Sequence, residues 1–464
     1  MNRRTEHKVQ APPRGWTRRE FLVRTLLSSV SAGSAGALAN LLFVSRVMAS
    51  EQRFSDYRAL VNIYLGGGND SLNMVFPRDA SYTAYADTRQ TMAWAQGSGR
   101  AITPATAQFF EPALAPALAQ TASLFADGDL AILANVGVLT EPATRAQLLA
   151  DPRLLPVQLF SHNDQQGHWF RGHTGTRDLT GWAGRTADLL MDADPDAVLP
   201  LNVSTWGIQQ WQAGAATTGY SIGTDGATTL VHLADDPNLQ LRTDTHRRIM
   251  ELASSPLERQ YAATFDRTRR LSVDVNAALD LTDTSSIPVP ANNELAQQLS
   301  MIARLIEAQS RFGQSRQVFT AHLGGWDTHD RQMDLHPQNL AQLDEALGYF
   351  AERLKELNRF NDVTTFTMSE FGRTLTTNGD GTDHGWGGHQ CVMGGAVAGG
   401  DIVGTLPALG IGSDDDLGDG RIIPTTSVEQ MGSALLRWFG LTESEIGTVF
   451  PFADRFDPIV LFRR

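Results

Sequence analysis

Among its 464 residues the sequence contains a single cysteine, Cys391. One cysteine cannot form an intramolecular disulfide, so the fold cannot depend on disulfide cross-links in any redox compartment. Beyond the first 50 residues, no apolar run approaches the ~18–20 residues that a membrane-spanning helix needs. The sequence therefore predicts that residues 50–464 form a soluble protein stabilised by its own core.

The sequence also has no excess of basic over acidic residues. The formal net charge is −13, and residues 1–49 contribute +6 through eight Lys or Arg and two Asp or Glu. Residues 50–464 therefore carry a net charge of −19. Nucleic acids and anionic lipid surfaces bind through basic patches, so this charge argues against both classes of partner.

Two motifs of well-known enzyme classes are missing. The sequence contains no Gly-x-Ser-x-Gly nucleophile elbow and no convincing nucleotide-binding glycine fingerprint. Ser161 precedes His162, and Ser71 follows Asp70. An isolated serine usually serves as a turn residue or a helix cap. We favour Ser161 as a nucleophile over Ser71 because a potential base, His162, and other polar side chains surround it in the sequence.

The N-terminal 49 residues have the pattern of a twin-arginine signal peptide. Residues 17–22 read Thr-Arg-Arg-Glu-Phe-Leu, a mild apolar stretch follows at residues 26–44, and Val-Met-Ala at 47–49 offers a cleavage site. An uncleaved membrane anchor is the alternative, which Arg24 and Arg46 disfavour. We expect a signal peptide at residues 1–49, a single domain at residues 50–464, and a periplasmic or secreted protein exported by the twin-arginine route.

Apolar segments of strand length alternate with amphipathic segments of helix length along the rest of the chain. This alternation predicts an α/β fold with a mostly parallel central sheet, helices on both faces and loop insertions, the longest within residues 140–290. The predicted strands cover residues 60–65, 130–136, 317–323 and 363–368. The predicted helices cover residues 112–126, 293–312, a segment that opens at Pro337, and a segment from Thr426 or Ser427 to Gly440.

Carboxylates and imidazoles follow three of the predicted strands. Six of these side chains form the predicted metal site: Asp70, Asp327, His329, Glu370, Asp383 and His384. Ligands gathered where strands end are typical of binding sites in α/β proteins. Carboxylate oxygen and neutral imidazole suit a divalent metal, namely zinc, manganese, magnesium or calcium. Two ions about 4 Å apart would polarise a phosphoryl or sulfuryl group.

Each of these residues also has an ordinary structural interpretation. Asp70 could cap the following helix, Glu370 and Arg373 could form a buried ion pair, and His384 and His389 could hydrogen-bond loop backbone. Direct ligation by any of His162, His168 and His173 is the less favoured interpretation of a polar segment. Trp182, Trp326 and Trp386 are expected to pack in the interior rather than to contact a substrate.

From about residue 59 to its C-terminus the chain resembles the bacterial "domain of unknown function 1501" family. The resemblance is carried by six motifs, which are Gly67-Gly68-Asn69-Asp70-Ser71-Leu72-Asn73, Phe160-Ser161-His162, Gly181-Trp182-Ala183-Gly184-Arg185, Gly325-Trp326-Asp327-Thr328-His329, Ser369-Glu370-Phe371-Gly372-Arg373 and Gly381-Thr382-Asp383-His384-Gly385. Their order along one chain makes the resemblance specific. The family is in turn distantly similar to the alkaline phosphatase and sulfatase superfamily.

This second resemblance implies an alkaline-phosphatase-like fold with one or two metals at strand ends. Asp70 would match the metal aspartate of the first strand, Asp327 and His329 the first Asp/His pair, and His384 the last metal histidine. The chain departs from the superfamily pattern where Glu370-Phe371 replaces an Asp-His pair, so that an imidazole is lost.

Two hypotheses follow. In the first, the protein is an exported metal-dependent hydrolase of a phosphate or sulfate ester, carried by a small molecule or a glycan, in which Ser161 is the nucleophile and Arg373 stabilises an anionic oxygen. In the second, it is a catalytically silent periplasmic binding or assembly protein that retains the superfamily fold.

Overall fold

A computed structural model describes residues 53–174, 178–228, 240–282 and 285–463. These residues divide into two units, one that contains residues 53–55 and Leu190–Pro195 and one that contains Asp56–Leu189 and Asp196–Arg464. All elements discussed below belong to the second unit. The predicted signal peptide, residues 1–49, lies outside the described residues, and the predicted domain boundaries stay predictions.

The second unit is built on a mostly parallel sheet of nine strands. The hydrogen-bonded order is β11-β5-β10-β9-β1-β8-β6-β7, with β12 also paired to β5. β10 runs antiparallel to both of its neighbours, while the other pairs of the sheet are parallel. The strands are β1 (Arg58–Leu65), β5 (Leu130–Gly137), β6 (Asn202–Ser204), β7 (Tyr220–Ser221), β8 (Arg316–Leu323), β9 (Val363–Met368), β10 (Gly388–Met393), β11 (Ile402–Val403) and β12 (Thr426–Ser427).

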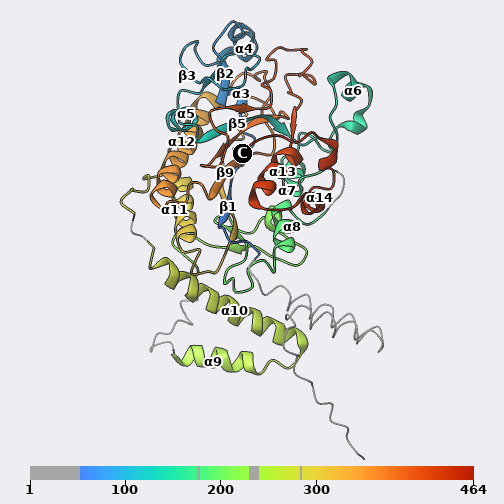
Figure 1. Ribbon diagram of the computed structural model, residues 1–464. Helices are drawn as coiled ribbons and strands as arrows, with labels where there is room; N and C mark the ends of the chain where they lie inside the picture. Colours follow the sequence, from blue (N-terminus) through green and yellow to red (C-terminus); the bar gives the residue numbers. More distant parts are fainter. Residues whose placement is uncertain (1–52, 175–177, 229–239, 283–284, 464) are drawn as a thin grey trace, which may run out of the picture. The chain divides into compact units, whose positions relative to one another are not determined.

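Helices flank the sheet on both sides, as Figure 1 shows. One group packs against the apolar face that β1 presents through Val61 and Ile63, and it contains α5 (Ala119–Ala126), α11 (Glu294–Glu307) and α12 (Gln332–Glu356). The other group contains α7 (His162–Arg171), α8 (Trp182–Leu189), α13 (Val428–Phe439) and α14 (Glu443–Val449). The predicted α/β class, with a mostly parallel sheet between helices, is confirmed.

The remaining elements lie outside these layers. A small sheet joins β2 (Val75–Pro77), β4 (Pro112–Leu114) and β3 (Arg100–Ala101). Short helices are α3 (Ser71–Met74), α4 (Tyr82–Arg89) and α6 (Arg145–Ala150), and two longer helices, α9 (Gln240–Glu251) and α10 (Pro256–Leu279), occupy part of the predicted insertion. Among the described residues, no helix combines the length and the apolar character that a membrane crossing requires.

Most element predictions agree with the structure, and three boundaries are wrong. The helix predicted over residues 293–312 ends at Glu307, where a turn begins. The predicted helix 112–126 is a strand followed by a helix, because Pro112–Leu114 pairs with β2 before α5 begins at Ala119. α12 begins at Gln332 rather than at Pro337, because buried hydrogen bonds of the Gln332 side chain fix an earlier start. The predicted end of α13 is confirmed: Ser427 forms a capping box and Gly440 adopts a φ of 106°.

Candidate metal site

The candidate site lies where the loops after β8 and β9 meet the first residue of α7. Asp327 and His329 follow β8, His384 lies in the loop between β9 and β10, and His162 begins α7. Gly67, just after β1, lets the loop after β1 approach the loop after β8 closely. It has a φ of +123°, and a Cβ there would lie 2.3 Å from the backbone nitrogen of Asp327, so only glycine fits.

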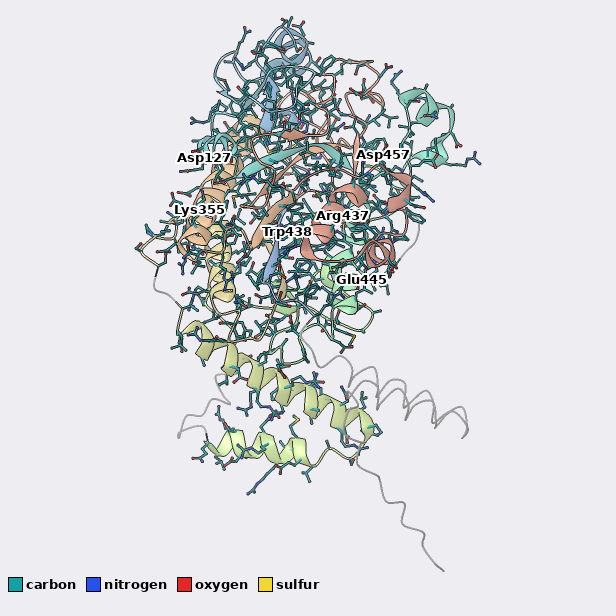
Figure 2. All side chains as sticks on the ribbon, in the orientation of Figure 1. Asp127, Lys355, Arg437, Trp438, Glu445 and Asp457 are labelled. Carbon is teal, nitrogen blue, oxygen red and sulfur yellow. The ribbon has the colours of Figure 1, made fainter. Side chains whose placement is uncertain are left out.

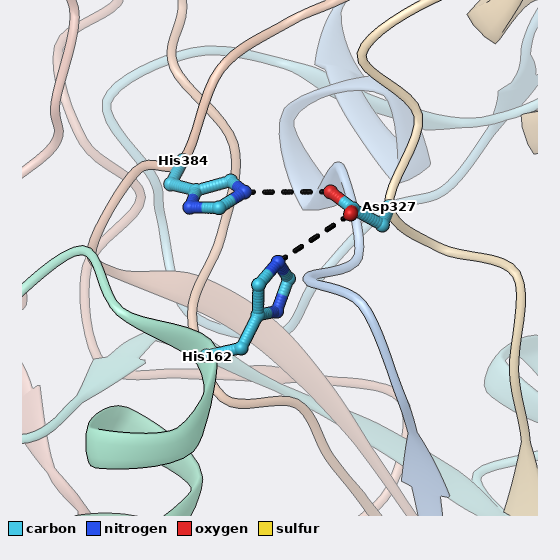
Figure 3. A group of neighbouring side chains, drawn as sticks. All are labelled: His162, Asp327 and His384. Atoms are coloured by element: carbon cyan, nitrogen blue, oxygen red, sulfur yellow. Dashed lines mark hydrogen bonds and ion pairs between the residues drawn. The ribbon is translucent and has the colours of Figure 1, made fainter.

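Three side chains form a group that could hold a metal ion: His162, Asp327 and His384 (Figure 3). One ligand atom from each lies within 4.8 Å of the others. His162 Nε2 is 3.5 Å from Asp327 Oδ2, and His384 Nε2 is 3.4 Å from Asp327 Oδ1. Zinc–ligand bonds of about 2.0–2.2 Å in a tetrahedron place neighbouring ligand atoms roughly 3.3–3.5 Å apart, so each of these two distances, one to each oxygen of Asp327, suits a pair of ligand atoms.

His329 extends this group on one side. Its Nε2 lies 2.8 Å from His384 Nε2 and 3.1 Å from Asp327 Oδ1. The predicted ligands Asp327, His329 and His384 are therefore brought together by the fold. His162 was the less favoured residue in the sequence, and the structure places it in the same group.

Each of the three imidazoles is oriented by an oxygen that faces its Nδ1 atom. His162 Nδ1 lies 2.8 Å from Glu370 Oε1, His384 Nδ1 lies 2.8 Å from the carbonyl oxygen of Phe160, and His329 Nδ1 lies 3.2 Å from Asp383 Oδ1. A carbonyl or an ionised carboxylate can only accept, so this network assigns the ring proton to Nδ1 and a lone pair to Nε2. Metal-binding histidines are held in this way.

This assignment has an electrostatic consequence at the centre of the site. The lone pairs of His329 Nε2 and His384 Nε2 face each other at 2.8 Å, next to the carboxylate of Asp327. Such an arrangement is repulsive unless a proton or a cation lies between the atoms. The donor set of two or three imidazoles and one carboxylate matches zinc or another borderline divalent metal.

Glu370 lies beneath the cluster and supports it. Its side chain is 5% exposed; the Tyr64 hydroxyl donates to Oε2 at 3.0 Å and the Gly67 N–H donates to Oε1 at 2.8 Å. The hydrogen bond with Glu370, the largest cause, raises the pKa of His162 above its usual value. In these contacts Glu370 and Asp383 orient histidines rather than face the centre directly.

Asp70 has different partners from the other predicted ligands. Its carboxylate is fully buried, pairs with the guanidinium of Arg89 and accepts a hydrogen bond from Gln332. His336, also buried, hydrogen-bonds Asn69 next to it. The structure therefore places Asp70 in a buried polar network, and its predicted role as a ligand stays a prediction.

The two predicted catalytic residues are both engaged by the protein. The Ser161 hydroxyl donates to Asp164 Oδ2 at 2.8 Å at the start of α7. Arg373 is buried and donates to Asp327 Oδ1 at 2.5 Å and to backbone carbonyls of Gly67, Gly68, Trp326 and Thr382. Burial would raise the pKa of Asp327, but the hydrogen bond and charge of Arg373 outweigh it and lower that pKa. Contact of Ser161 or Arg373 with a substrate stays a prediction.

The remaining polar and aromatic residues singled out in the sequence take structural positions. His168, His173 and His389 are buried, and His389 Nδ1 accepts from the Asn135 N–H at 3.0 Å. Trp182, Trp326 and Trp386 are buried, as predicted. Phe371, which follows Glu370, packs its ring against those of His162 and His384, at centroid distances of 4.8 and 4.6 Å. It forms an apolar wall of the site.

Comparison with known proteins gives one sequence family and several distant structures. The family model "Protein of unknown function (DUF1501)" matches residues 209–443. No curated protein matches the sequence.

Three of the similar solved structures share 10% identity or less with this chain. The PsFucS1 sulfatase from Pseudoalteromonas sp. is 10% identical over 86% of this chain and 71% of its own, with a TM-score of 0.33. The lipoteichoic acid synthase LtaP from Listeria monocytogenes is 8% identical over 84% and 73%, with a TM-score of 0.29. The C-terminal periplasmic domain of EcEptC from Escherichia coli, solved in complex with Zn, is 8% identical over 74% and 75%, with a TM-score of 0.26. Likenesses of this size assign no activity.

Proposed function

The chain belongs to the DUF1501 family of proteins of unknown function, and from the geometry of its own site we propose that it is a metal-dependent hydrolase of a phosphate or sulfate ester. The observation that supports this proposal is the convergence of imidazole Nε2 atoms on Asp327. The Nδ1 atoms of His162, His329 and His384 all face protein oxygens. A site preorganised in this way binds a divalent ion at little cost.

His162, Asp327 and His384 would hold the ion, with His329 at its side. Three protein ligands leave a coordination position open, as in catalytic rather than structural zinc sites. When bound, the ion would supply Lewis-acid polarisation of a phosphoryl or sulfuryl oxygen. The side chain of Asp327 is 47% exposed, so a substrate can reach the site from solvent.

The protein's own residues provide the remaining functions. Glu370, Asp383 and the Phe160 carbonyl set the orientation of the imidazoles, and Arg373 holds Asp327 in place. Ser161 is the proposed nucleophile, and Asp164, which accepts its hydroxyl proton in a hydrogen bond at 2.8 Å, is placed to take that proton.

A test combines metal analysis with turnover of generic substrates. Protein loaded separately with zinc, manganese, magnesium or calcium is assayed for bound metal and for hydrolysis of an aryl phosphate and an aryl sulfate. We expect one ion per chain with at least one metal, turnover with one ester class, and loss of both in Asp327→Ala and in His384→Ala. Asp330→Ala, a neighbouring exposed carboxylate, is the matched control and should change neither.

A catalytically silent binding or assembly protein is the second candidate. It is favoured by one observation: Arg373 is buried, and its donors are directed at backbone carbonyls and at Asp327 rather than at solvent. Stoichiometric bound metal without turnover of either ester would support this candidate. Absence of both bound metal and turnover would rule out the proposed hydrolase activity.

Export belongs to the proposal as well. The twin-arginine pattern at residues 17–22 and the cleavage site at 47–49 support delivery of residues 50–464 to the periplasm or beyond. Replacement of Arg18 and Arg19 by lysine should retain the full-length chain in the cytoplasm, which fractionation and mass measurement of the N-terminus would detect. An unprocessed chain in the periplasm would contradict cleavage.

A further inference from the structure

Two neighbouring helices carry apolar side chains that the rest of the described chain does not cover. No residue of α9 is buried, and in α10 the buried residues are confined to the second half: Ser272, Val275, Ala278 and Leu279. We call α9 and the first half of α10 the hairpin, residues 240–270. Figure 1 shows it apart from the two helix layers that flank the sheet.

The exposed apolar residues of the hairpin form a stripe on each helix. Leu241, Ile249 and Leu252 are 80%, 58% and 79% exposed, and Leu257 and Tyr261 are 80% and 61% exposed. At 100° per residue, each set falls within one face of its helix. Large exposed apolar residues grouped in this way mark an interaction surface.

The hairpin is basic in an acidic protein. Residues 240–270 contain seven arginines and four carboxylates, a net charge of +3. Since residues 50–464 carry −19 together, the remainder carries −22. Arg242 and Arg248 are exposed, and on the helical wheel they lie on either side of the apolar stripe of α9. The hairpin therefore fits a partner surface that is both apolar and acidic.

A surface of this kind exists elsewhere on the same chain. A cavity of about 690 Å³ is lined by apolar side chains, among them Leu139, Ile423 and Phe456, and by the carboxylates of Asp414, Asp415 and Asp457. Figure 2 labels Asp457, which lies well above the two hairpin helices in this view. Arg145 also lines the cavity and keeps its positive charge, but three carboxylates against one guanidinium leave the lining with a net charge of −2.

We propose that the hairpin docks on the acidic cavity of a second copy of this chain, so that two copies form a dimer. Opposite charges would guide and orient the contact, and the leucines and Tyr261 would bury apolar area in the cavity. If a twofold axis relates the two copies, the hairpin of each copy docks on the cavity of the other. Both hairpins and both cavities are then occupied, so no third copy is added. This inference does not depend on the metal site or on the proposed reaction.

A charge-exchange experiment tests the proposal on the full mature chain. The hairpin variant carries Arg242→Glu and Arg248→Glu, and the cavity variant carries Asp414→Arg and Asp457→Arg. Asp415 is left unchanged because its carboxylate accepts from the Ala408 N–H. Masses in solution are measured by sedimentation velocity, and circular dichroism checks that each variant is folded.

We expect the wild-type protein to be a dimer that weakens as salt is raised. Each variant alone should be monomeric, with a dissociation constant raised by more than about 100-fold because like charges meet. An equimolar mixture should restore a heterodimer, since both of its interfaces then join opposite charges. Reversal of the exposed Arg311 is the control and should leave the dimer intact.

Three results would overturn the proposal. They are a monomeric wild-type chain at low salt, a dimer that survives both reversals, and a mixture that stays monomeric. Sedimentation with vesicles of phosphatidylglycerol and phosphatidylcholine tests whether the hairpin instead binds an anionic membrane surface. A monomeric wild-type chain that sediments with them, when the hairpin variant does not, would assign the hairpin to an anionic membrane surface instead.

Discussion

Glu370 and His162 form the contact that joins α7 to the sheet at the site. Glu370 Oε1 lies 2.8 Å from His162 Nδ1, while the other carboxylate oxygen accepts from Tyr64 of β1. One buried side chain therefore fixes the orientation of an imidazole that comes from a different part of the chain. Several measurable consequences follow from this contact and from others in the structure.

Removal of the Glu370 carboxylate should weaken metal binding without removing a ligand that faces the centre. Glu370→Ala leaves His162 without its Nδ1 acceptor, and loss of such an orienting group typically costs about 10–100-fold in affinity. Competition with a chelator would measure the change. Tyr64→Phe, which removes one hydrogen bond to the same carboxylate, is the control and should cost less than about tenfold. Unchanged affinity in Glu370→Ala would refute the orienting role.

A substitution of Asp70 tests whether this carboxylate stabilises the fold or binds the metal. Asp70→Asn leaves Arg89 buried without its counter-charge, and breaking a buried pair costs roughly 3–5 kcal/mol. We expect a large loss in the free energy of denaturant unfolding, while the metal content of the folded protein stays that of the wild type. Loss of metal from a variant that remains folded would show instead that Asp70 is a ligand.

Glu429 should make the protein less stable as pH rises above neutrality. Burial raises its pKa to about 8 from an ordinary 4.5, because the carboxyl group is 1% exposed. Between pH 4.5 and about 8 the carboxyl group has released its proton in the unfolded state but keeps it in the folded state. The free energy of unfolding therefore falls as pH rises, until the folded pKa is passed. Between pH 6.5 and 8 the loss is about 2 kcal/mol, at 1.4 kcal/mol per pH unit.

Glu429→Gln should remove the Glu429 contribution to this slope in denaturant unfolding measured at several pH values from 6.5 to 8, while the contribution of His162, whose pKa is also raised, remains. The pKa values of the buried histidines His336 and His389 are lowered to about 4 from an ordinary 6.5, so these residues add stability as pH rises through about 6.5. Their contribution is the same in the wild type and in the variant, so it cancels from the difference between the two slopes. Glu443→Gln, which replaces an exposed carboxylate paired with Arg437, is the control and should keep the wild-type slope. An identical slope in Glu429→Gln would show that Glu429 is not the cause.

Cys391 should report unfolding rather than react in the native protein. The thiol is buried in β10, and burial raises its pKa to about 12. The thiolate is the reactive form, so a thiol reagent should label the folded chain only through opening of the structure. The labelling rate should rise along the denaturant unfolding curve. Rapid, complete labelling in native buffer would contradict the burial of this strand.

The sequence predicted much of the sheet and part of the site. β9 was predicted with both of its ends, and Asp327 and His384 were predicted as neighbours because both follow apolar strands. His162 was less favoured because nothing in its local segment shows that α7 begins at the sheet edge, about 165 residues before Asp327. Its position next to Ser161 in a family motif was the only available signal.

The buried partners of the site could not be predicted from local patterns. The pairing of Asp70 with Arg89 depends on the fold around α3 and α4, and that of Glu370 with Tyr64 on the register of β1 and β9. Sequence spacing indicates which residue types lie near a strand end. It does not indicate which oxygen of a carboxylate faces a ring and which faces a buried hydroxyl.

Because His162 lies on α7, a bound metal would affect which segment of the protein unfolds first. α7 supplies one imidazole, whereas Asp327, His329 and His384 come from loops anchored on the sheet. A cation bound by both would hold α7 against the loops that follow β8 and β9. Its removal would release the helix first, and a protease would then cut near residues 155–172 while the strands still resisted.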